Sequence, residues 1–224
     1  MLLINLVKSK LEFNSEKIKN VSREANKGDE IMGLDMHLKK GKKIPKISFE
    51  EYKKINNKVL EEDKETLEKY KDYIQECGEH IHWKSLLDDV AYWRKANQIH
   101  KWFVDNVQDG TDDCDYYEVS KEDIEKLLNL CKEVIDKTIT KKGKVVNGQF
   151  LKNGTWQNNY EDGLVIINPD VAEELLPTQA GFFFGSTGYD EYYLENLKYT
   201  VEEFEKILKE FDFENNYLVY TSSW

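Results

Sequence analysis

The sequence has few cysteines and no long apolar run. Three cysteines (Cys77, Cys114 and Cys131) are an odd number and too scattered for a disulfide framework, which favours a reducing cytoplasm. The opening MLLINLV is apolar for only seven residues before Lys8 and lacks the basic-then-apolar order of a signal peptide. We therefore expect a cytoplasmic protein with no membrane segment and no targeting signal.

Positive charge is also scarce, because the formal net charge is −11 and the sequence pI is about 5.0. A nucleic-acid-binding surface needs clustered lysine and arginine to neutralise phosphates, so direct nucleic-acid binding is not expected. The acidity leaves open an acidic surface that mimics nucleic acid. Hydrophobic residues make up 40% of the chain and aromatic residues 12%, which is enough for a substantial core.

Residues 1–31 differ from the rest of the chain. They lack sustained apolar periodicity, whereas MGLDMHL from Met32 begins like the first strand of a domain. The codons for KGDEI, just before Met32, can contain a ribosome-binding sequence. Our hypothesis is that Met32 is the natural start and that residues 1–31 are an upstream leader.

The remaining chain has the pattern of an α+β domain. Apolar spacing predicts three main helices at 93–107, 121–136 and 189–211, and one or two more within 48–76. Ser48 with Glu51, and Ser120 with Asp123, are typical of helix starts. Strands are expected at MGLDMHL, YYEV and NYLVYTSSW, and two Asn-Gly turns predict a hairpin before Asn168. GFFFGS is expected to be a buried strand or a tight extended segment. We expect a small, mostly antiparallel sheet packed against the three main helices, with a helical insertion.

The segment YWRKANQIHKWF contains the first candidate site. On a helix beginning at Trp93, the polar residues Asn97 and His100 fall on an apolar stripe, while Lys95 and Gln98 face solvent. Either backbone groups satisfy Asn97 and His100 within the core, or the two side chains line a ligand pocket.

Arg94 is the only arginine after Met32 in a chain with 30 lysines. A planar, bidentate guanidinium suits a phosphate, a carboxylate or a stacked base. The alternative is a surface arginine paired with one of the many carboxylates.

The segment LLPTQAGFFFGSTGYDEYY contains the second candidate site. Ser186 and Thr187 precede a predicted helix whose free N–H groups attract anions, although Asp190 already places a negative charge there. The alternative to an anion site is that the glycines form turns and that Ser186 or Thr187 caps the helix. Together the two segments give the following predicted ligand-binding residues: Trp93, Arg94, Asn97, His100, Thr178, Gln179, Ser186, Thr187, Tyr189 and Asp190.

Signals for metals and cofactors are weak. CGEHIH offers Cys77, His80 and His82, but no second ligand pair follows, and DNVQDGTDDCD lacks the ligand spacing of an EF-hand. Only their presence in the sequence supports a nucleophilic pair of Cys114 with His100. We therefore expect no metal and no cofactor.

Four segments, MGLDMHL, YWRKANQIHKWFVDNVQDGTDDCDYYEVSKEDIEKLL, ELLPTQAGFFFGSTGYDEYY and SSW, resemble a family of small bacteriophage and prophage proteins. The resemblance covers about 110 residues from Met32 onward and carries no established reaction. Compared with that family the chain has extra material, so we expect a single α+β domain over 32–224 with insertions at about 39–88 and 138–167.

The resemblance implies a phage accessory protein that counters host defence in the cytoplasm of the infected bacterium. Our leading hypothesis is a non-enzymatic protein that sequesters a phosphate-containing nucleotide immune signal, with Arg94 binding the phosphate and aromatic rings stacking on the base. One alternative is an inhibitor that binds a host defence protein through an acidic surface. Another is a nucleotide-signal hydrolase that uses His100 and Asp190 as acid and base. Tyr192 and Tyr199 share a flank of the predicted long helix, where they face either a ligand or a partner chain such as a second copy in a homo-oligomer.

Overall fold

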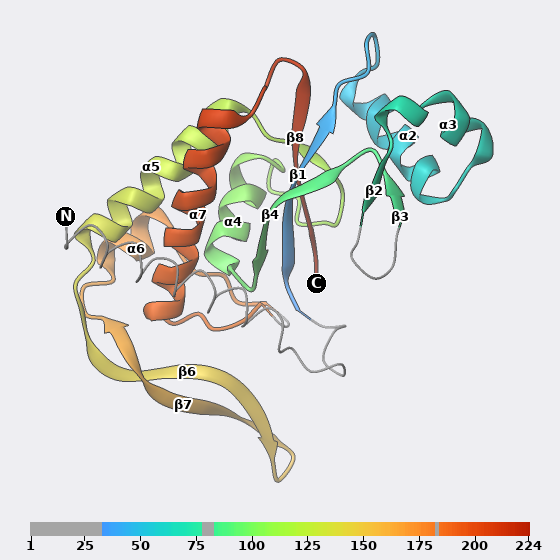
Figure 1. Cartoon of the computed structure of the whole chain (residues 1–224). Helices are drawn as coiled ribbons and strands as arrows, with labels where there is room; N and C mark the ends of the chain where they lie inside the picture. Colours follow the sequence, from blue (N-terminus) through green and yellow to red (C-terminus); the bar gives the residue numbers. More distant parts are fainter. Residues whose placement is uncertain (1–32, 78–82, 182–183) are drawn as a thin grey trace, which may run out of the picture. The chain divides into compact units, whose positions relative to one another are not determined.

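A four-stranded antiparallel sheet lies at the centre of the fold, in the order β4-β1-β8-β5 (Figure 1). The computed structural model describes residues 33–77, 83–181 and 184–224, with only the backbone of Gln149. The predicted leader, residues 1–31, lies outside the described residues. The sheet strands are β1 (Asp35–Lys42), β4 (Asp88–Arg94), β5 (Tyr117–Glu118) and β8 (Asn216–Ser223).

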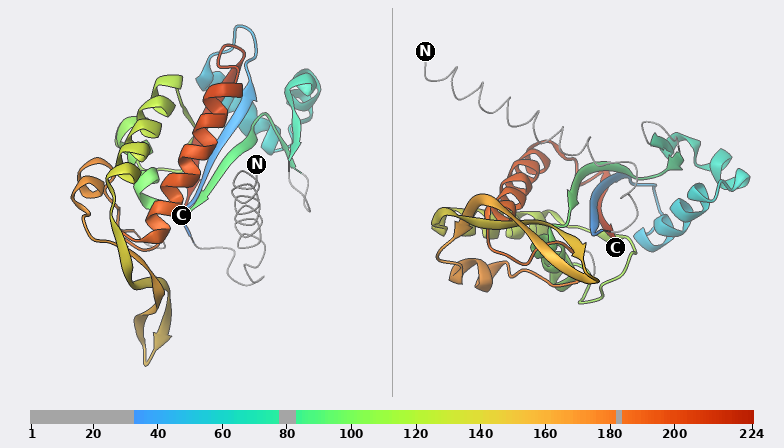
Figure 2. Two further views of the ribbon diagram at one scale, coloured as in Figure 1. Left: turned by 60° about the vertical axis from the view of Figure 1, so that its left-hand side comes forward. Right: turned by 90° about the horizontal axis from the view of Figure 1, so that it is seen from below.

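The two faces of the sheet are covered differently, and the alternation of side chains along β8 shows how. Leu218 and Tyr220 belong to the larger core, which three helices build: α4 (Asn97–Asn106), α5 (Lys121–Lys137) and α7 (Glu191–Glu210). Tyr217 and Val219 belong to a second cluster with Tyr52 of α2 (Phe49–Leu60). Figures 1 and 2 show the three long helices grouped on one side of the sheet. The predicted α+β class with antiparallel sheets is confirmed.

The smaller elements near α2 are α3 (Lys64–Lys69), the 3₁₀ helix η1 (Lys71–Tyr73) and a ribbon of β2 (Gln75–Cys77) and β3 (Trp83–Ser85). The predicted helical start at Ser48 is confirmed, because the Ser48 hydroxyl accepts a hydrogen bond from the Glu51 N–H. Gly41 of β1 lets Tyr52 approach closely. A Cβ at this position would overlap the Tyr52 hydroxyl and lie 2.8 Å from Leu87 Cδ2.

The helix predicted at 121–136 is confirmed as α5. Its first turn has a complete capping box, in which Ser120 and Asp123 each accept a hydrogen bond from the other's backbone N–H. The short helix α6 (Asp170–Leu175) follows Pro169, and α7 begins directly after Asp190.

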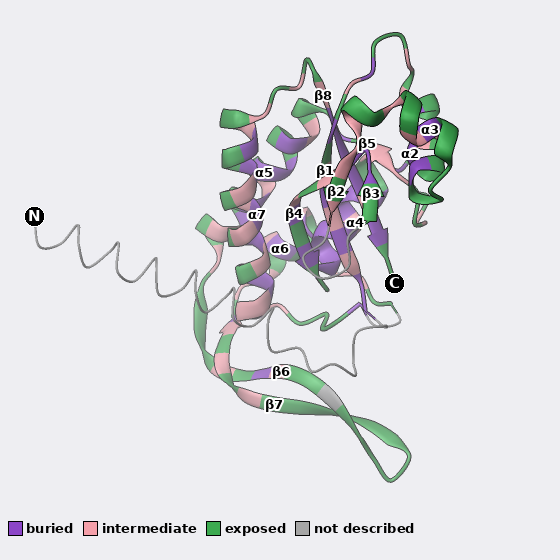
Figure 3. Ribbon diagram, turned by 45° about the vertical axis from the view of Figure 1, so that its right-hand side comes forward, coloured by how far each residue is buried: buried purple, intermediate pink, exposed green. Residues whose placement is uncertain are grey.

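The predicted hairpin is confirmed as β6 (Thr140–Lys152) and β7 (Thr155–Ile166), which extend away from the helices (Figures 1 and 2). Its turn is at Asn153-Gly154, where both residues have positive φ, 52° and 77°. The other Asn-Gly pair forms a bulge, because the register shifts between Val146 and Gln149. Most of this hairpin is exposed (Figure 3).

Two local predictions are wrong. Residues 93 and 94 are not helical: they end β4, and α4 begins only at Asn97, after Lys95 with φ of 60°. Gln98 is buried rather than solvent-facing, because α4 is covered on most of its sides and the Gln98 amide donates to the carbonyl oxygen of Tyr193. Of the two alternatives for GFFFGS, its described residues form no strand, and hydrogen bonds to a side chain of α4 hold this segment.

The insertion expected at about 39–88 stays a prediction, and in the structure both ends of this segment belong to the central sheet. β1 continues to Lys42 and β4 begins at Asp88, so the residues that leave the sheet between these strands are 43–87. The predicted insertion at about 138–167 coincides closely with the β6–β7 hairpin.

Candidate functional site

Asn97, in the first turn of α4, is fully buried and fully hydrogen-bonded. Its Nδ2 donates to the carbonyl oxygens of Phe184 at 3.1 Å and Ser186 at 2.9 Å, and its Oδ1 accepts from the Gln179 N–H at 3.0 Å. These three bonds fix both ends of the segment 179–186. Asn97 therefore holds a loop, and its polar groups are satisfied by the backbone.

The predicted residues that follow Pro177 form a network with one another. The Thr178 hydroxyl donates to the carbonyl oxygen of Thr187 at 3.1 Å, and the Thr178 N–H donates to the Tyr189 hydroxyl at 3.2 Å. Ser186 Oγ accepts from the Gly188 N–H. Gln179 Oε1 is buried without a hydrogen-bond partner among the described residues. The loop is thus braced internally at the start of α7.

His100 is buried at the other end of this network. Its Nδ1 lies 2.8 Å from the Tyr220 hydroxyl, its Nε2 lies 3.0 Å from Asp112 Oδ1, and its ring meets Phe184 edge-on. Burial lowers the pKa of His100, and Asp112 opposes this shift. Both ring nitrogens are engaged within the protein.

Trp93 and Arg94 do not join this group of side chains. The Trp93 indole is buried, its Nε1 donates to Thr200 Oγ1 at 2.9 Å, and it packs edge-on against Phe204. Arg94 is exposed at the end of β4, opposite Asp35 of β1. The structure therefore brings together the predicted residues from Asn97 and from 178–189, without the guanidinium that was expected to bind phosphate.

Asp190 connects this network to the hairpin. Its Oδ1 caps α7 by accepting from the N–H groups of Tyr192 and Tyr193, and it lies in an isolated bridge with Val165 of β7. The Asp190 carboxyl is nearly inaccessible, and burial raises its pKa against the effect of the two capping bonds. The Ile166 N–H donates to the carbonyl oxygen of Tyr189 at 3.0 Å.

A second connection holds the hairpin base to the first turn of α7. Glu191 Oε2 accepts from the Leu164 N–H at 3.2 Å, and the Tyr192 hydroxyl donates to Glu161. Gly163 permits this approach, because a Cβ there would overlap the Glu191 carboxylate and lie 2.8 Å from Val145 Cγ2. The residues predicted to bind a ligand thus help to position the base of the hairpin.

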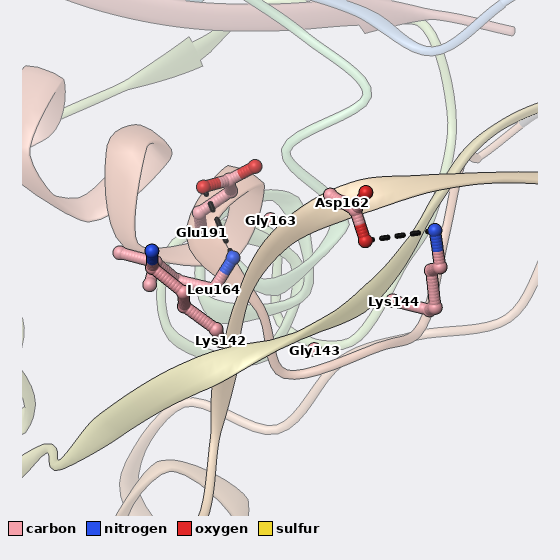
Figure 4. Close-up of a pocket in the computed structure, with 7 residues that line it drawn as sticks. All are labelled: Lys142, Gly143, Lys144, Asp162, Gly163, Leu164 and Glu191. Atoms are coloured by element: carbon pink, nitrogen blue, oxygen red, sulfur yellow. Dashed lines mark hydrogen bonds and ion pairs between the residues drawn. The ribbon is translucent and has the colours of Figure 1, made fainter.

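A cavity of about 610 Å³ opens at this base (Figure 4). Lys144 Nζ is paired with Asp162 Oδ1 at 2.7 Å, whereas the described residues offer Lys142 no ion pair. The cavity is lined by Lys142, Gly143, Lys144, Asp162, Gly163, Leu164 and Glu191. None of these residues was predicted to be part of a site: the Asn-Gly turns indicate the hairpin but not where it meets α7.

A smaller cavity of about 170 Å³ lies between α2 and α3, with Lys58, Asp63 and Lys69 among its lining residues. Drug-sized ligands occupy cavities of roughly 300–1,000 Å³, so of these two cavities the one at the hairpin base has the volume for a nucleotide. The larger cavity is therefore the better candidate for a ligand site.

The described part of the chain has neither a cluster of metal ligands nor a membrane-spanning helix. No three His, Cys, Asp or Glu side chains within it are grouped as metal ligands, and His80 and His82 lie outside the described residues. None of its helices is both long enough and apolar enough to cross a bilayer.

Comparison of the chain with protein-family models, with curated proteins and with solved structures finds no match.

Proposed function

We propose that this protein is a non-enzymatic binding protein that sequesters a phosphate-containing nucleotide signal in the cavity at the base of the hairpin. The supporting observation is a cavity of nucleotide size bordered by two lysines, one of which has no ion-pair partner among the described residues. In the context that the resemblance implies, the protein acts in the cytoplasm of an infected bacterium and withholds the signal from host defence.

The charges around the cavity fit such a ligand. The Lys142 ammonium would donate a hydrogen bond to a phosphate oxygen, because Lys144 is already paired with Asp162. The carboxylates of Asp162 and Glu191 are acceptors for ribose hydroxyl or base amino groups. A nucleotide carries both kinds of group, whereas a simple anion could bind Lys142 but offers no donor to the two carboxylates.

Sequestration is favoured over hydrolysis by the state of the groups that hydrolysis would use. Both nitrogens of His100 are engaged by Tyr220 and Asp112, and Asp190 caps a helix. Neither His100 nor Asp190 lines the cavity. The proposed binding site is therefore at the hairpin base, and not at Arg94 and Asn97, where the sequence predicts it.

Isothermal titration against cyclic dinucleotides and cyclic ADP-ribose-type signals tests the proposal. We expect one of them to bind, and Lys142→Ala to weaken binding at least about tenfold through loss of a charge-assisted hydrogen bond. Lys209→Ala is the matched control, because Lys209 is a highly exposed lysine of α7 far along the helix from the cavity. Absence of binding by the folded protein would overturn the proposal, and equal affinity of Lys142→Ala would overturn the site.

The charge distribution supports a second candidate, inhibition of a host defence protein through an acidic surface. Residues 140–166 hold four lysines and two acidic residues, so the excess of negative charge lies outside the hairpin. Such docking would weaken steeply with salt. Capture of one host protein at low salt, lost at high salt and retained in Lys142→Ala, would favour this candidate over nucleotide binding.

A further inference from the structure

One face of the hairpin carries exposed apolar side chains in a regular row. Trp156, Tyr160 and Leu164 point to the same face of β7, with exposures of 64%, 58% and 39%. Asn158 and Asp162 lie between them on that face. Across the strands, Leu151 pairs with Trp156 and Val146 pairs with Tyr160, which adds two apolar residues to that face. The five apolar residues are called the apolar face below.

Nothing in the described part of the chain buries the apolar face. The contacts that hold the hairpin to α7 are made at its base, by Glu161 and the Leu164 N–H. Soluble monomers rarely leave two neighbouring aromatic rings and a leucine uncovered, and an isolated two-stranded ribbon is only marginally stable in water. The face therefore has the character of an interface.

We propose that the apolar face binds the same face of a second copy of this chain and forms a twofold symmetric dimer. The even spacing of Trp156, Tyr160 and Leu164 fits the same face of a second copy. Trp156 and Leu164 each lie about 13 Å from Tyr160 along the strand, given about 3.3 Å per residue. Rotation by 180° about an axis at Tyr160 therefore sets Tyr160 against Tyr160 and each Trp156 against the partner's Leu164, as an isologous interface requires.

The charge pattern also favours a second copy at this face. The chain carries −11 overall, but Lys152 is the only charged residue between Val145 and Tyr160. On the same face Asp162 is paired with Lys144, so two hairpins can approach with little repulsion.

The area involved is adequate for association. A buried tyrosine or tryptophan removes roughly 150–250 Å² from water. Two copies of the apolar face together bury on the order of 1,000 Å², which is the lower limit for a specific interface. The apolar face shares Leu164 with the cavity proposed above, but sedimentation of the ligand-free protein tests the dimer without the nucleotide, so each proposal stands or fails separately.

Sedimentation velocity on the full chain tests the dimer. We expect a dimer for the wild-type protein and a monomer for the double variant Trp156→Ala/Tyr160→Ala. Phe150→Ala is the matched control: Phe150 is 45% exposed, but it pairs with Gln157 and therefore points to the opposite face. Because all three side chains are exposed, the variants are expected to fold, which circular dichroism verifies.

A cysteine placed on the proposed axis gives a second measurement. In a Cys114→Ser background, which removes the exposed native thiol, Tyr160→Cys should form a disulfide-linked dimer on mild oxidation, and Phe150→Cys should not. Association should be undiminished by high salt, because its contacts are apolar and salt screens the repulsion between two acidic chains.

Three results would overturn the proposal. The first is a wild-type protein that stays monomeric from micromolar to millimolar concentration. The second is equal loss of the dimer in Phe150→Ala. The third is a monomer that binds a single-stranded oligonucleotide through Trp156, which would assign the face to stacking on bases.

Discussion

Asn97 Nδ2 donates a hydrogen bond of 2.9 Å to the carbonyl oxygen of Ser186, joining the first turn of α4 to the loop that precedes α7. The same side chain also binds the backbone of Phe184 and Gln179. One amide therefore holds three backbone groups of a loop whose described residues have no regular secondary structure.

Loss of the Asn97 amide should lower the stability of the fold. Asn97→Ala leaves two backbone carbonyls and one N–H without their partner, and we expect the free energy of unfolding to fall by about 3 kcal/mol. Asn97→Asp keeps the acceptor for Gln179 but loses both donated bonds, so it should also destabilise the fold. Urea unfolding measures both changes.

Lys101→Ala is the control for Asn97, because Lys101 is on the same helix and makes only a surface ion pair with Asp105. We expect that variant to lose about 0.5 kcal/mol at most. Similar losses in Asn97→Ala and Lys101→Ala would contradict the anchoring role.

Stability should depend on pH through His100. Burial lowers its pKa below the ordinary 6.5, so the unfolded chain binds a proton more readily than the folded one. The contribution of neutral His100 to the free energy of unfolding is therefore complete above about pH 6.5 and declines as the pH falls below this value. In His100→Gln the group is absent, and the decline between about pH 7 and pH 5 should be smaller.

Unfolding by urea at a series of pH values compares wild type with His100→Gln. The difference between the two proteins isolates this one group from the carboxylates that titrate in both. If the free energy of unfolding falls equally in both proteins between about pH 7 and pH 5, His100 is not the source of the pH dependence.

Two helix caps allow a matched comparison. Ser120→Ala and Asp190→Ala each remove an N-cap, of α5 and α7, and each should cost about 1 kcal/mol of stability. Only Asp190 is bridged to β7, next to the bond from the Ile166 N–H to Tyr189. Hydrogen exchange at Ile166 should therefore accelerate more in Asp190→Ala than in Ser120→Ala. Equal acceleration would mean that the cap does not hold the hairpin base.

The close approach of Gly41 and Tyr52 should appear as an energetic coupling. Gly41→Ala places a methyl group on the Tyr52 hydroxyl and should cost about 1–3 kcal/mol through overpacking. Tyr52→Phe removes that hydroxyl together with its hydrogen bond to the Leu86 carbonyl oxygen. We expect the double variant to be more stable than the sum of the single changes predicts, and additive effects would contradict the contact.

Where local signals agree, the sequence predicts the structure well. The capping pattern at Ser120 and the apolar spacing after it define α5, and the Asn-Gly turn at 153–154 defines the hairpin. Each depends on interactions within a few residues. Long-range packing therefore does not change these two elements.

The segment around Trp93 shows why other predictions failed. In β4 the buried residues Ala91 and Trp93 alternate with exposed ones, but Trp93 also fits the helical spacing of Asn97 and His100. The change occurs at Lys95, where positive φ in a lysine has no signature in the sequence. The cavity at the hairpin base depends on where β7 meets α7, which no local pattern encodes.

The order of strands in the central sheet has a consequence for folding kinetics. β1 pairs along its whole length with β8, so that Asp35 lies opposite Ser223. Closing so long a loop is entropically unfavourable, and folding slows as contacts become more distant in sequence. The hairpin and the long helices depend on nearer contacts and should form early. The central pair of strands cannot form until residues 216–223 have left the ribosome, and the edge of β1 that binds β8 must avoid aggregation until then.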